Sequence, residues 1–85
     1  MIDIKFDIDN NKAIAYDNEK QVGICEFLER ENEWNIVHTE VSELYKGQGI
    51  ARRLVECVIE NAKVNNKKII ADCSYAKKVL ENNNV

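Results

Sequence analysis

Two of the three glycines in this 85-residue chain, Gly47 and Gly49, lie within three residues of each other, directly before a run with helical periodicity. Apolar residues recur in that run at spacings of three and four as far as Asn65, which predicts an amphipathic helix. Glycines at a helix start allow a ligand to approach the backbone and leave N–H groups at the positive end of the helix dipole. The stretch predicts an anion site, most naturally for phosphate, although an ordinary glycine turn has the same pattern.

The chain before this helix has the periodicity of strands. Apolar and polar residues alternate from Ile2 to Ile8, which is typical of a half-buried strand. Three further strands are expected, at residues 13–16, 21–28 and 34–41. Short turns would join the four strands into an antiparallel meander, with a solvated loop from Glu29 to Glu33. Gly23 indicates either a bulge or a close approach of another segment.

The chain after the glycine pair predicts a β-α-β unit. The helix is expected from about Gln48 to Asn65, where Asn65 and Asn66 would stop it because asparagine tolerates a left-handed cap. Residues 67–73 predict a fifth strand parallel to the fourth, through a right-handed crossover. Ser74 is predicted to be the N-cap of a short last helix ending near Asn82. The fold class is therefore α+β (mixed α/β), in a single domain over residues 1–85.

Composition excludes several classes of function. The net charge of −3 argues against nonspecific nucleic-acid binding, which needs a basic field. No run of about 18 apolar residues is present to span a membrane, and no secretory signal is expected. The three cysteines, Cys25, Cys57 and Cys73, are odd in number and far apart, so neither a disulfide scaffold nor a metal site is expected. A reducing cytoplasm is the expected location.

The glycine loop resembles a known family motif. Residues Lys46-Gly47-Gln48-Gly49-Ile50-Ala51 resemble the pyrophosphate loop of the GNAT acyltransferase superfamily, which reads Gln/Arg-x-x-Gly-x-Gly/Ala after a Val-x-x-x-Tyr-type lead-in. Val41, Tyr45, Gly49 and Ala51 match that pattern. Lys46 stands where Gln or Arg is usual, a departure that keeps the charge but loses the planar fork of arginine.

The order of predicted elements is similar to a reduced GNAT domain. A usual GNAT domain has two helices between its first and second strands, and this chain has only turn residues there. The runs His38-Thr39-Glu40-Val41 and Cys73-Ser74-Tyr75-Ala76 resemble motifs of a minimal GNAT-like subfamily, sometimes called the YjdJ type. That resemblance implies a reduced GNAT-like fold and acetyl-CoA as cosubstrate.

The resemblance also implies where acetyl-CoA binds. Loop N–H groups would hold the pyrophosphate, and the fourth and fifth strands would splay apart to admit the pantetheine arm. An N–H group of the fourth strand would then polarise the thioester carbonyl. Arg52 could add charge, although an exposed helix arginine needs no ligand. The implied binding residues are Val37, Thr39, Val41, Lys46, Gly47, Gln48, Gly49, Ile50, Ala51 and Arg52.

Three residues are candidates for catalysis. His38, the only histidine, could act as a general base for an amine, or could simply lie in a sheet face. Cys73 precedes a helix, which favours the thiolate and acyl transfer through cysteine, whereas a buried cysteine would only pack. Tyr75 could protonate the CoA thiolate. The tyrosine of many GNAT enzymes lies further into the last helix, where this chain has Val79 and Leu80.

Two functions therefore remain open. One is an acetyl-CoA-dependent N-acetyltransferase that acts on an unidentified amine, a small molecule or a protein, by direct attack or through cysteine. The alternative is a module that binds acetyl-CoA or CoA without robust transferase activity, because helices that usually shape the acceptor pocket are missing. A Rossmann nucleotide site fails because Arg52 replaces the third glycine and two βαβ halves are lacking.

Overall fold

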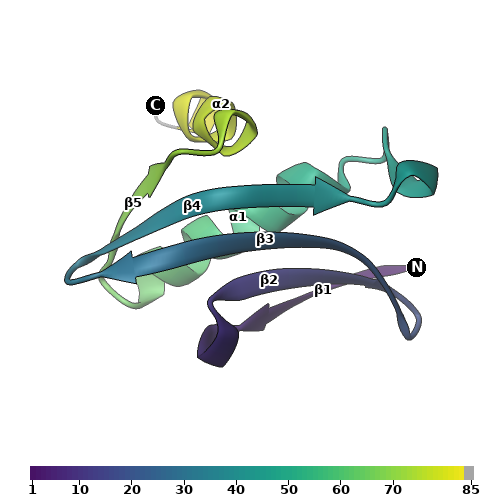
Figure 1. The fold of residues 1–85 in the computed structure, drawn as a ribbon, viewed down its shortest axis with the longest axis horizontal. Helices are drawn as coiled ribbons and strands as arrows, with labels where there is room; N and C mark the ends of the chain where they lie inside the picture. The colour runs from purple at the N-terminus through teal and green to yellow at the C-terminus, as the bar shows by residue number, and fades with distance from the viewer. Residues whose placement is uncertain (84–85) are drawn as a thin grey trace.

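A computed structural model describes residues 1–83 and shows one five-stranded sheet with two α-helices (Figure 1). The strands are β1 (Ile2–Asp7), β2 (Lys12–Asp17), β3 (Lys20–Arg30), β4 (Glu33–Val41) and β5 (Lys68–Ala71); the helices are α1 (Ile50–Val64) and α2 (Ser74–Asn83), and the short 3₁₀ helices are η1 (Ile8–Asn10) and η2 (Glu43–Tyr45). The strands lie in chain order, antiparallel from β1 to β4, with β5 parallel to β4. This arrangement confirms the predicted α+β class.

The end of β1 differs from the prediction. The strand stops at Asp7, whose side chain accepts a hydrogen bond from the Asn10 N–H at 3.3 Å. Asn11 then adopts a left-handed conformation, with φ of 55°, and starts the return into β2. Ile8 belongs to η1 and is 50% exposed, so its prediction as part of a half-buried strand is wrong. Local capping by aspartate outweighed the alternating pattern.

The predicted loop over residues 29–33 is also wrong. β3 and β4 pair as far as Arg30 and Glu33, so only Glu31 and Asn32 form the turn. Glu31 takes a positive φ of 43° there. The Lys67 ammonium contacts the Glu29 carboxylate at 3.1 Å, which ties this hairpin to the segment after α1.

The ends of α1 are set by residues with left-handed backbone. Gly49, with φ of 78°, is the N-cap, so the helix begins at Ile50 rather than Gln48. At the other end Asn66 has φ of 57°, and the N–H groups of Asn66 and Lys67 bond to carbonyls of the last turn at 3.1 and 2.8 Å. This pair of bonds is a Schellman motif, and it confirms the predicted stop at the two asparagines.

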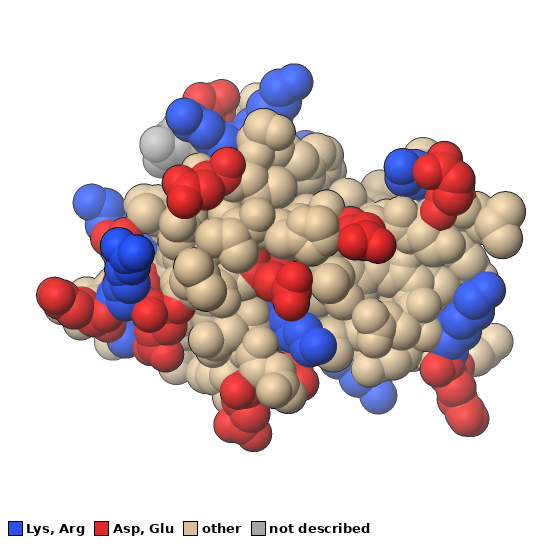
Figure 2. Space-filling view, viewed as in Figure 1, with Lys and Arg blue, Asp and Glu red and all other residues tan. Residues whose placement is uncertain are grey.

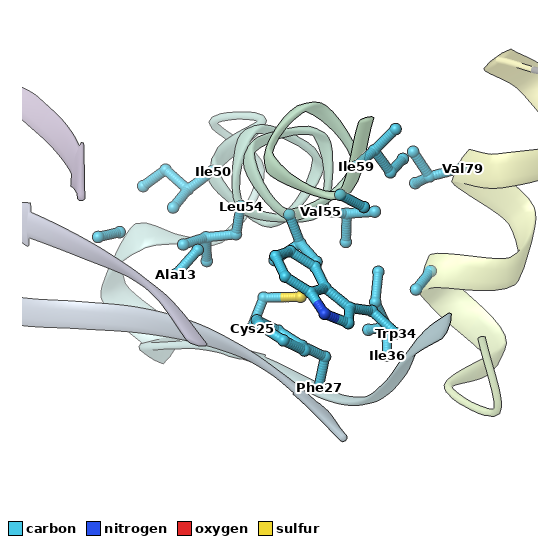
Figure 3. Packing of buried hydrophobic residues seen from close by; sticks show 14 of the residues in the cluster. Ala13, Cys25, Phe27, Trp34, Ile36, Ile50, Leu54, Val55, Ile59 and Val79 are labelled. Carbon is cyan, nitrogen blue, oxygen red and sulfur yellow. The ribbon is translucent and has the colours of Figure 1, made fainter. Parts of the chain in front are cut away.

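The core lies between the sheet and its helices (Figure 3). Phe27 and Trp34 stack with ring centroids 4.3 Å apart, and Phe6 stacks beside them. Residues from both helices belong to this one core: Ile50, Leu54, Val55, Val58, Ile59 and Ala62 of α1, with Ala76 and Val79 of α2. Figure 1 shows α1 behind the sheet, so the face toward the viewer lacks a helical cover. No helix within residues 1–83 is long and apolar enough to cross a bilayer.

β4 consists of two unlike halves. The paired half, Glu33–Ile36, has β3 on one side and β5 on the other. The open half, Val37–Val41, pairs with β3 alone, because the N–H groups of Asp72 and Cys73 both turn onto the Ile36 carbonyl at 3.0 Å. The β3 register shifts between these halves and leaves Val37 as an extra residue, which is a β-bulge. The fourth and fifth strands therefore diverge after Ile36.

Gly23 lies opposite the end of the open half. The register of β2 and β3 shifts beside it and leaves Val22 as an extra residue, so a bulge is present. A Cβ on Gly23 would come within 3.0 Å of the Glu40 carbonyl and 3.1 Å of a Leu54 methyl, so a close approach is present too. Both alternatives left open by the sequence occur here, one residue apart.

Candidate functional site

A cavity of about 460 Å³ lies where the open half of β4, the loop into α1 and the start of α2 meet. Its lining residues are Thr39, Val41, Tyr45, Lys46, Gly47, Gly49, Ile50, Ala51 and Tyr75. In Figure 2 the upper outline is hollowed between the lobe of α2 and the lobe of η2. The structure thus brings most of the predicted binding residues, and Tyr75, to one place.

The glycine loop opens its backbone toward this cavity. Gly47 and Gly49 have φ of 83° and 78°, a region that residues with a Cβ rarely adopt. A Cβ on either glycine would meet no atom within 4 Å, so conformation rather than crowding requires glycine here. Within residues 1–83, the N–H groups of Gly49, Ile50 and Ala51 have no hydrogen-bond partner. These N–H groups form the positive end of the α1 dipole.

The charged side chains near the loop are tied to surface partners. The Lys46 ammonium lines the cavity and contacts the Glu43 carboxylate at 2.9 Å. The Arg52 guanidinium pairs with Glu56 at 3.1 Å, one turn along α1, and neither Arg52 nor Gln48 lines the cavity. In the part of the chain that is described, no three His, Cys, Asp or Glu side chains gather to hold a metal ion.

The open half of β4 turns part of its backbone away from β3. The Ser42 N–H donates to the Val22 carbonyl of β3 at 2.7 Å. Because backbone direction alternates along a strand, Thr39 and Val41 direct their N–H and C=O groups to the opposite, unpaired edge. Cys73 lies beyond that edge, where a backbone hydrogen bond from Thr39 is among the causes that lower the pKa of its thiol. Val37, the bulge residue, is 36% exposed and does not line the cavity.

Cys73 occupies the N-cap position of α2. Its carbonyl accepts the first helical bond, from the Lys77 N–H at 2.9 Å, so the prediction of Ser74 as N-cap is wrong by one residue. Burial acts to raise the pKa of the Cys73 thiol. Hydrogen bonds from the Ala76 N–H, the Thr39 hydroxyl and the N–H groups of Tyr75 and Thr39 outweigh burial and lower that pKa.

The pKa values of the other two cysteines are raised rather than lowered. Burial raises the pKa of the Cys25 thiol to about 12, and Cys25 is fully buried in the core. Burial also raises the pKa of Cys57, which packs against the core from α1. Cys25 and Cys57 therefore act as packing residues, and Cys73 is the cysteine whose environment favours the thiolate.

His38 lies apart from the cavity. Thr39 contacts the buried Cys25, so its side chain is on the face covered by α1, and its neighbour His38 points to the uncovered face. There the His38 Nε2 lies 3.0 Å from the Glu40 carboxylate, with about half of the His38 side chain exposed. The structure therefore does not bring His38 together with Cys73 and Tyr75.

Tyr75 lines the cavity from the first turn of α2 and is 40% exposed. Further along this helix Val79 is buried and Leu80 packs against the core, so no phenol stands at those positions. Tyr75 is therefore the one tyrosine of α2 within reach of the cavity.

Tyr45 is a lining residue that the sequence analysis did not assign. Its hydroxyl donates to the Asp17 carboxylate at 2.6 Å, and this hydrogen bond raises the pKa of Tyr45 and lowers that of Asp17. Tyr45 stands in the family lead-in, which was the available signal. Its partner lies 28 residues earlier, at the end of β2, where no local pattern indicates a contact.

A model of the GCN5-related N-acetyltransferase family matches residues 11–85. The chain belongs to this family, known as GNAT. A GNAT-type structure of high similarity is that of a GCN5-like protein of Staphylococcus aureus assigned as an N-acetyltransferase. It is 40% identical, with a TM-score of 0.72 over 94% of this chain and 78% of that chain. Membership in GNAT supports acetyl or acyl transfer as the general chemistry.

Longer GNAT structures share the fold. The ribosomal-protein-alanine N-acetyltransferase of Brucella melitensis is 18% identical, with a TM-score of 0.69 over 84% of this chain and 60% of that one. A chain of the NatC complex, solved with Gag peptide and CoA, is 26% identical, with a TM-score of 0.64 over 84% of this chain and 54% of that one. The present chain thus spans little more than half of these two neighbours. No curated protein matches it.

Proposed function

We propose that this chain is an acetyl-CoA-dependent N-acetyltransferase that binds acetyl-CoA in the cavity beside β4. One observation carries the proposal: a single cavity joins the unpaired N–H groups at the start of α1, the open edge of β4 and the first turn of α2. These features suit, in order, a pyrophosphate, an amide-containing arm and a thioester. The CoA bound in the NatC structure supports the same ligand class.

The loop residues fit the phosphate end of such a ligand. The N–H groups of Gly49, Ile50 and Ala51 would hold the pyrophosphate, and the Lys46 ammonium would exchange part of its contact with Glu43 for a phosphate oxygen. Gln48 and Arg52 lie outside the lining and would act from the rim.

The open half of β4 fits the pantetheine arm. The backbone of Thr39 and Val41 would bond to its amides as an added strand would, and Val37 would lie at the far end. The thioester would then rest near the Thr39 N–H, which is the candidate donor to its carbonyl oxygen.

Two routes of transfer begin from that placement. In the direct route a neutral amine attacks the thioester carbon and CoA leaves as its thiolate. The Tyr75 phenol gives its proton to that sulfur, and the acylated nitrogen loses its extra proton to the Tyr75 phenolate. In the covalent route the Cys73 thiolate attacks first, releasing CoA thiolate and forming acetyl-Cys73. The amine then attacks this second thioester and regenerates Cys73. A role for His38 as base stays a prediction, as do the cytoplasmic location and the YjdJ type.

A second function is favoured by one feature of the fold. β1 reaches β2 through η1 and Asn11 alone, so no α-helix stands where longer GNAT domains shape the acceptor pocket. Without those helices the acceptor pocket lacks one side. This favours a module that binds acetyl-CoA or CoA without robust transferase activity.

Gly49→Glu tests the ligand and its place. The carboxylate would enter the phosphate seat, and like-charge contact costs several kcal/mol, so acetyl-CoA affinity should fall by more than about 100-fold in calorimetry. Gly49→Ala is the matched control, because it carries the same left-handed strain without the charge and should bind within about tenfold of the wild type. Binding of wild-type strength by folded Gly49→Glu, checked by circular dichroism, would reject the site.

Release of free thiol from acetyl-CoA separates the two functions. Candidate amines, both small polyamines and lysine-containing peptides, are mixed with protein and acetyl-CoA, and CoA is measured with a thiol reagent. Amine-dependent release above the Gly49→Glu background supports the transferase. Tight binding with no release for any amine supports the module.

A further inference from the structure

We propose that the Thr39 side chain is the positioning residue for the Cys73 sulfur, linking it through one hydroxyl to the buried thiol of Cys25. The Thr39 Oγ1 lies 3.6 Å from the Cys73 Sγ and 3.6 Å from the Cys25 Sγ. The inference rests on the proposed function in that Cys73 there lies beside the thioester.

The fold places this hydroxyl between two thiols from distant parts of the chain. Cys25 and Thr39 are register partners on β3 and β4, and their side chains share the face covered by α1. Cys73 approaches from the end of β5, where pairing with β4 has stopped. The Thr39 N–H also donates to Cys73, so one residue offers this sulfur a main-chain and a side-chain donor.

A hydroxyl both donates and accepts, so the hydrogen bonds that join Cys73, Thr39 and Cys25 can run in either direction. With Cys73 protonated, its S–H donates to Thr39 Oγ1 and the hydroxyl donates to the Cys25 sulfur, as the structure shows. Loss of the Cys73 proton reverses the chain: the Cys25 S–H donates to Oγ1, and the hydroxyl turns toward the Cys73 thiolate. Cys25 can supply that proton in the hydrogen bond because burial keeps its thiol protonated. In both states the Thr39 hydroxyl donates one hydrogen bond and accepts one.

Hydrogen bonding is the main interaction that can stabilise a thiolate at Cys73. Cys25 interacts with Cys73, Cys57 and Glu26, and both other thiols have raised pKa values. The Asp72 carboxylate, next to Cys73, accepts a bond from the Asn35 amide at 2.9 Å. Burial and hydrogen bonds are the largest contributions to the pKa of Cys73. His38 and Glu40 point to the other face of the sheet, and Tyr75 faces the cavity.

The test is the pH profile of Cys73 alkylation by iodoacetamide in CoA-free protein, followed peptide by peptide with mass spectrometry. Thr39→Val keeps the shape and the main-chain N–H but removes the hydroxyl. Labelling near pH 7 should slow by about tenfold and the profile should move to higher pH, because a hydrogen bond to a charged group is lost. Thr39→Ser restores the hydroxyl and should follow the wild type.

Cys25→Ala is the matched control. It disturbs the same part of the core, but the thiol and thiolate states of Cys73 each lose one hydrogen bond of the chain. Its profile should therefore stay within about twofold of the wild type. Circular dichroism and thermal unfolding establish that each variant is folded, and Thr39→Ala replaces Thr39→Val if the latter is not.

The proposal would be overturned if the pH profiles of wild type and folded Thr39→Val superimposed. It would also be overturned if Cys25→Ala shifted the profile as far as Thr39→Val does. Because the labelling uses no acetyl-CoA, its outcome is independent of the proposed function. If the Thr39→Val profile shifts but the protein never releases CoA, the role of Thr39 at Cys73 is supported and the proposed transferase function is rejected.

Discussion

The two halves of β4 share one strand and differ in what they face. Trp34 and Ile36 of the paired half are almost completely buried, with hydrogen-bonded strands on both sides. Thr39 and Val41 of the open half line a cavity and present a backbone edge that pairs with no strand. Such an edge is a template for another extended segment. One strand thus supplies core packing at its start and a ligand-binding edge at its end, and the bulge at Val37 divides them.

The same division separates two cysteines. Cys25 lies beneath the open half, inside the core, and burial raises its pKa. Cys73 lies at the edge, where burial is outweighed by N–H donors from α2 and β4 and the pKa falls. Identical side chains on either side of Thr39 therefore differ in acidity because burial dominates at Cys25 and hydrogen-bond donors dominate at Cys73.

The largest expected effect comes from breaking the paired half. Trp34→Ala removes a buried ring that stacks on Phe27 and Phe6, and the free energy of unfolding should fall by about 3–5 kcal/mol in urea titration. Val37→Ala in the bulge is the control, because its side chain is partly exposed and the change should stay near 0.5 kcal/mol. Similar losses at both positions would mean that the two halves do not differ in energetic role.

A smaller effect is expected on the pH dependence of stability, which should differ between Cys73 and Cys25. The folded pKa of Cys73 lies below its ordinary value of 9.0, so its contribution is lost as pH falls. The gap in unfolding free energy between wild type and Cys73→Ala should therefore widen from pH 6 to pH 9.

The contribution of Cys25 to stability depends on pH in the opposite direction. Its folded pKa of about 12 lies above 9.0, so its contribution is present below pH 9 and lost as pH rises toward 12. The gap between wild type and Cys25→Ala should stay constant to pH 9 and then narrow by up to about 1.4 kcal/mol per pH unit. Urea titrations from pH 6 to pH 10.5 measure both gaps, and parallel curves for the two variants would refute the contrast.

Local patterns predicted most of the elements, and one backbone irregularity explains much of what they missed. Alternation from Trp34 would place His38 on the core face with Ile36 and turn Thr39 outward. The bulge at Val37 adds one residue and reverses both assignments. Glycine spacing predicted the loop because the left-handed backbone at Gly49 is a local requirement. The bulge depends on pairing between strands, which no single stretch of sequence specifies.

The smallest expected effect concerns the residue that the bulge moved. The His38 ring bonds to Glu40 on the uncovered face, away from the cavity, so His38→Ala should change acetyl-CoA affinity by less than about twofold. Ring resonances of His38 should likewise shift little when acetyl-CoA is titrated, whereas amide resonances of Thr39 and Gly49 should shift strongly. A large ring shift, or a loss of amine-dependent CoA release in His38→Ala with binding intact, would show that an acceptor meets the open half from the uncovered face. The base would then act across the sheet edge, and the division between the two faces of β4 would not hold for catalysis.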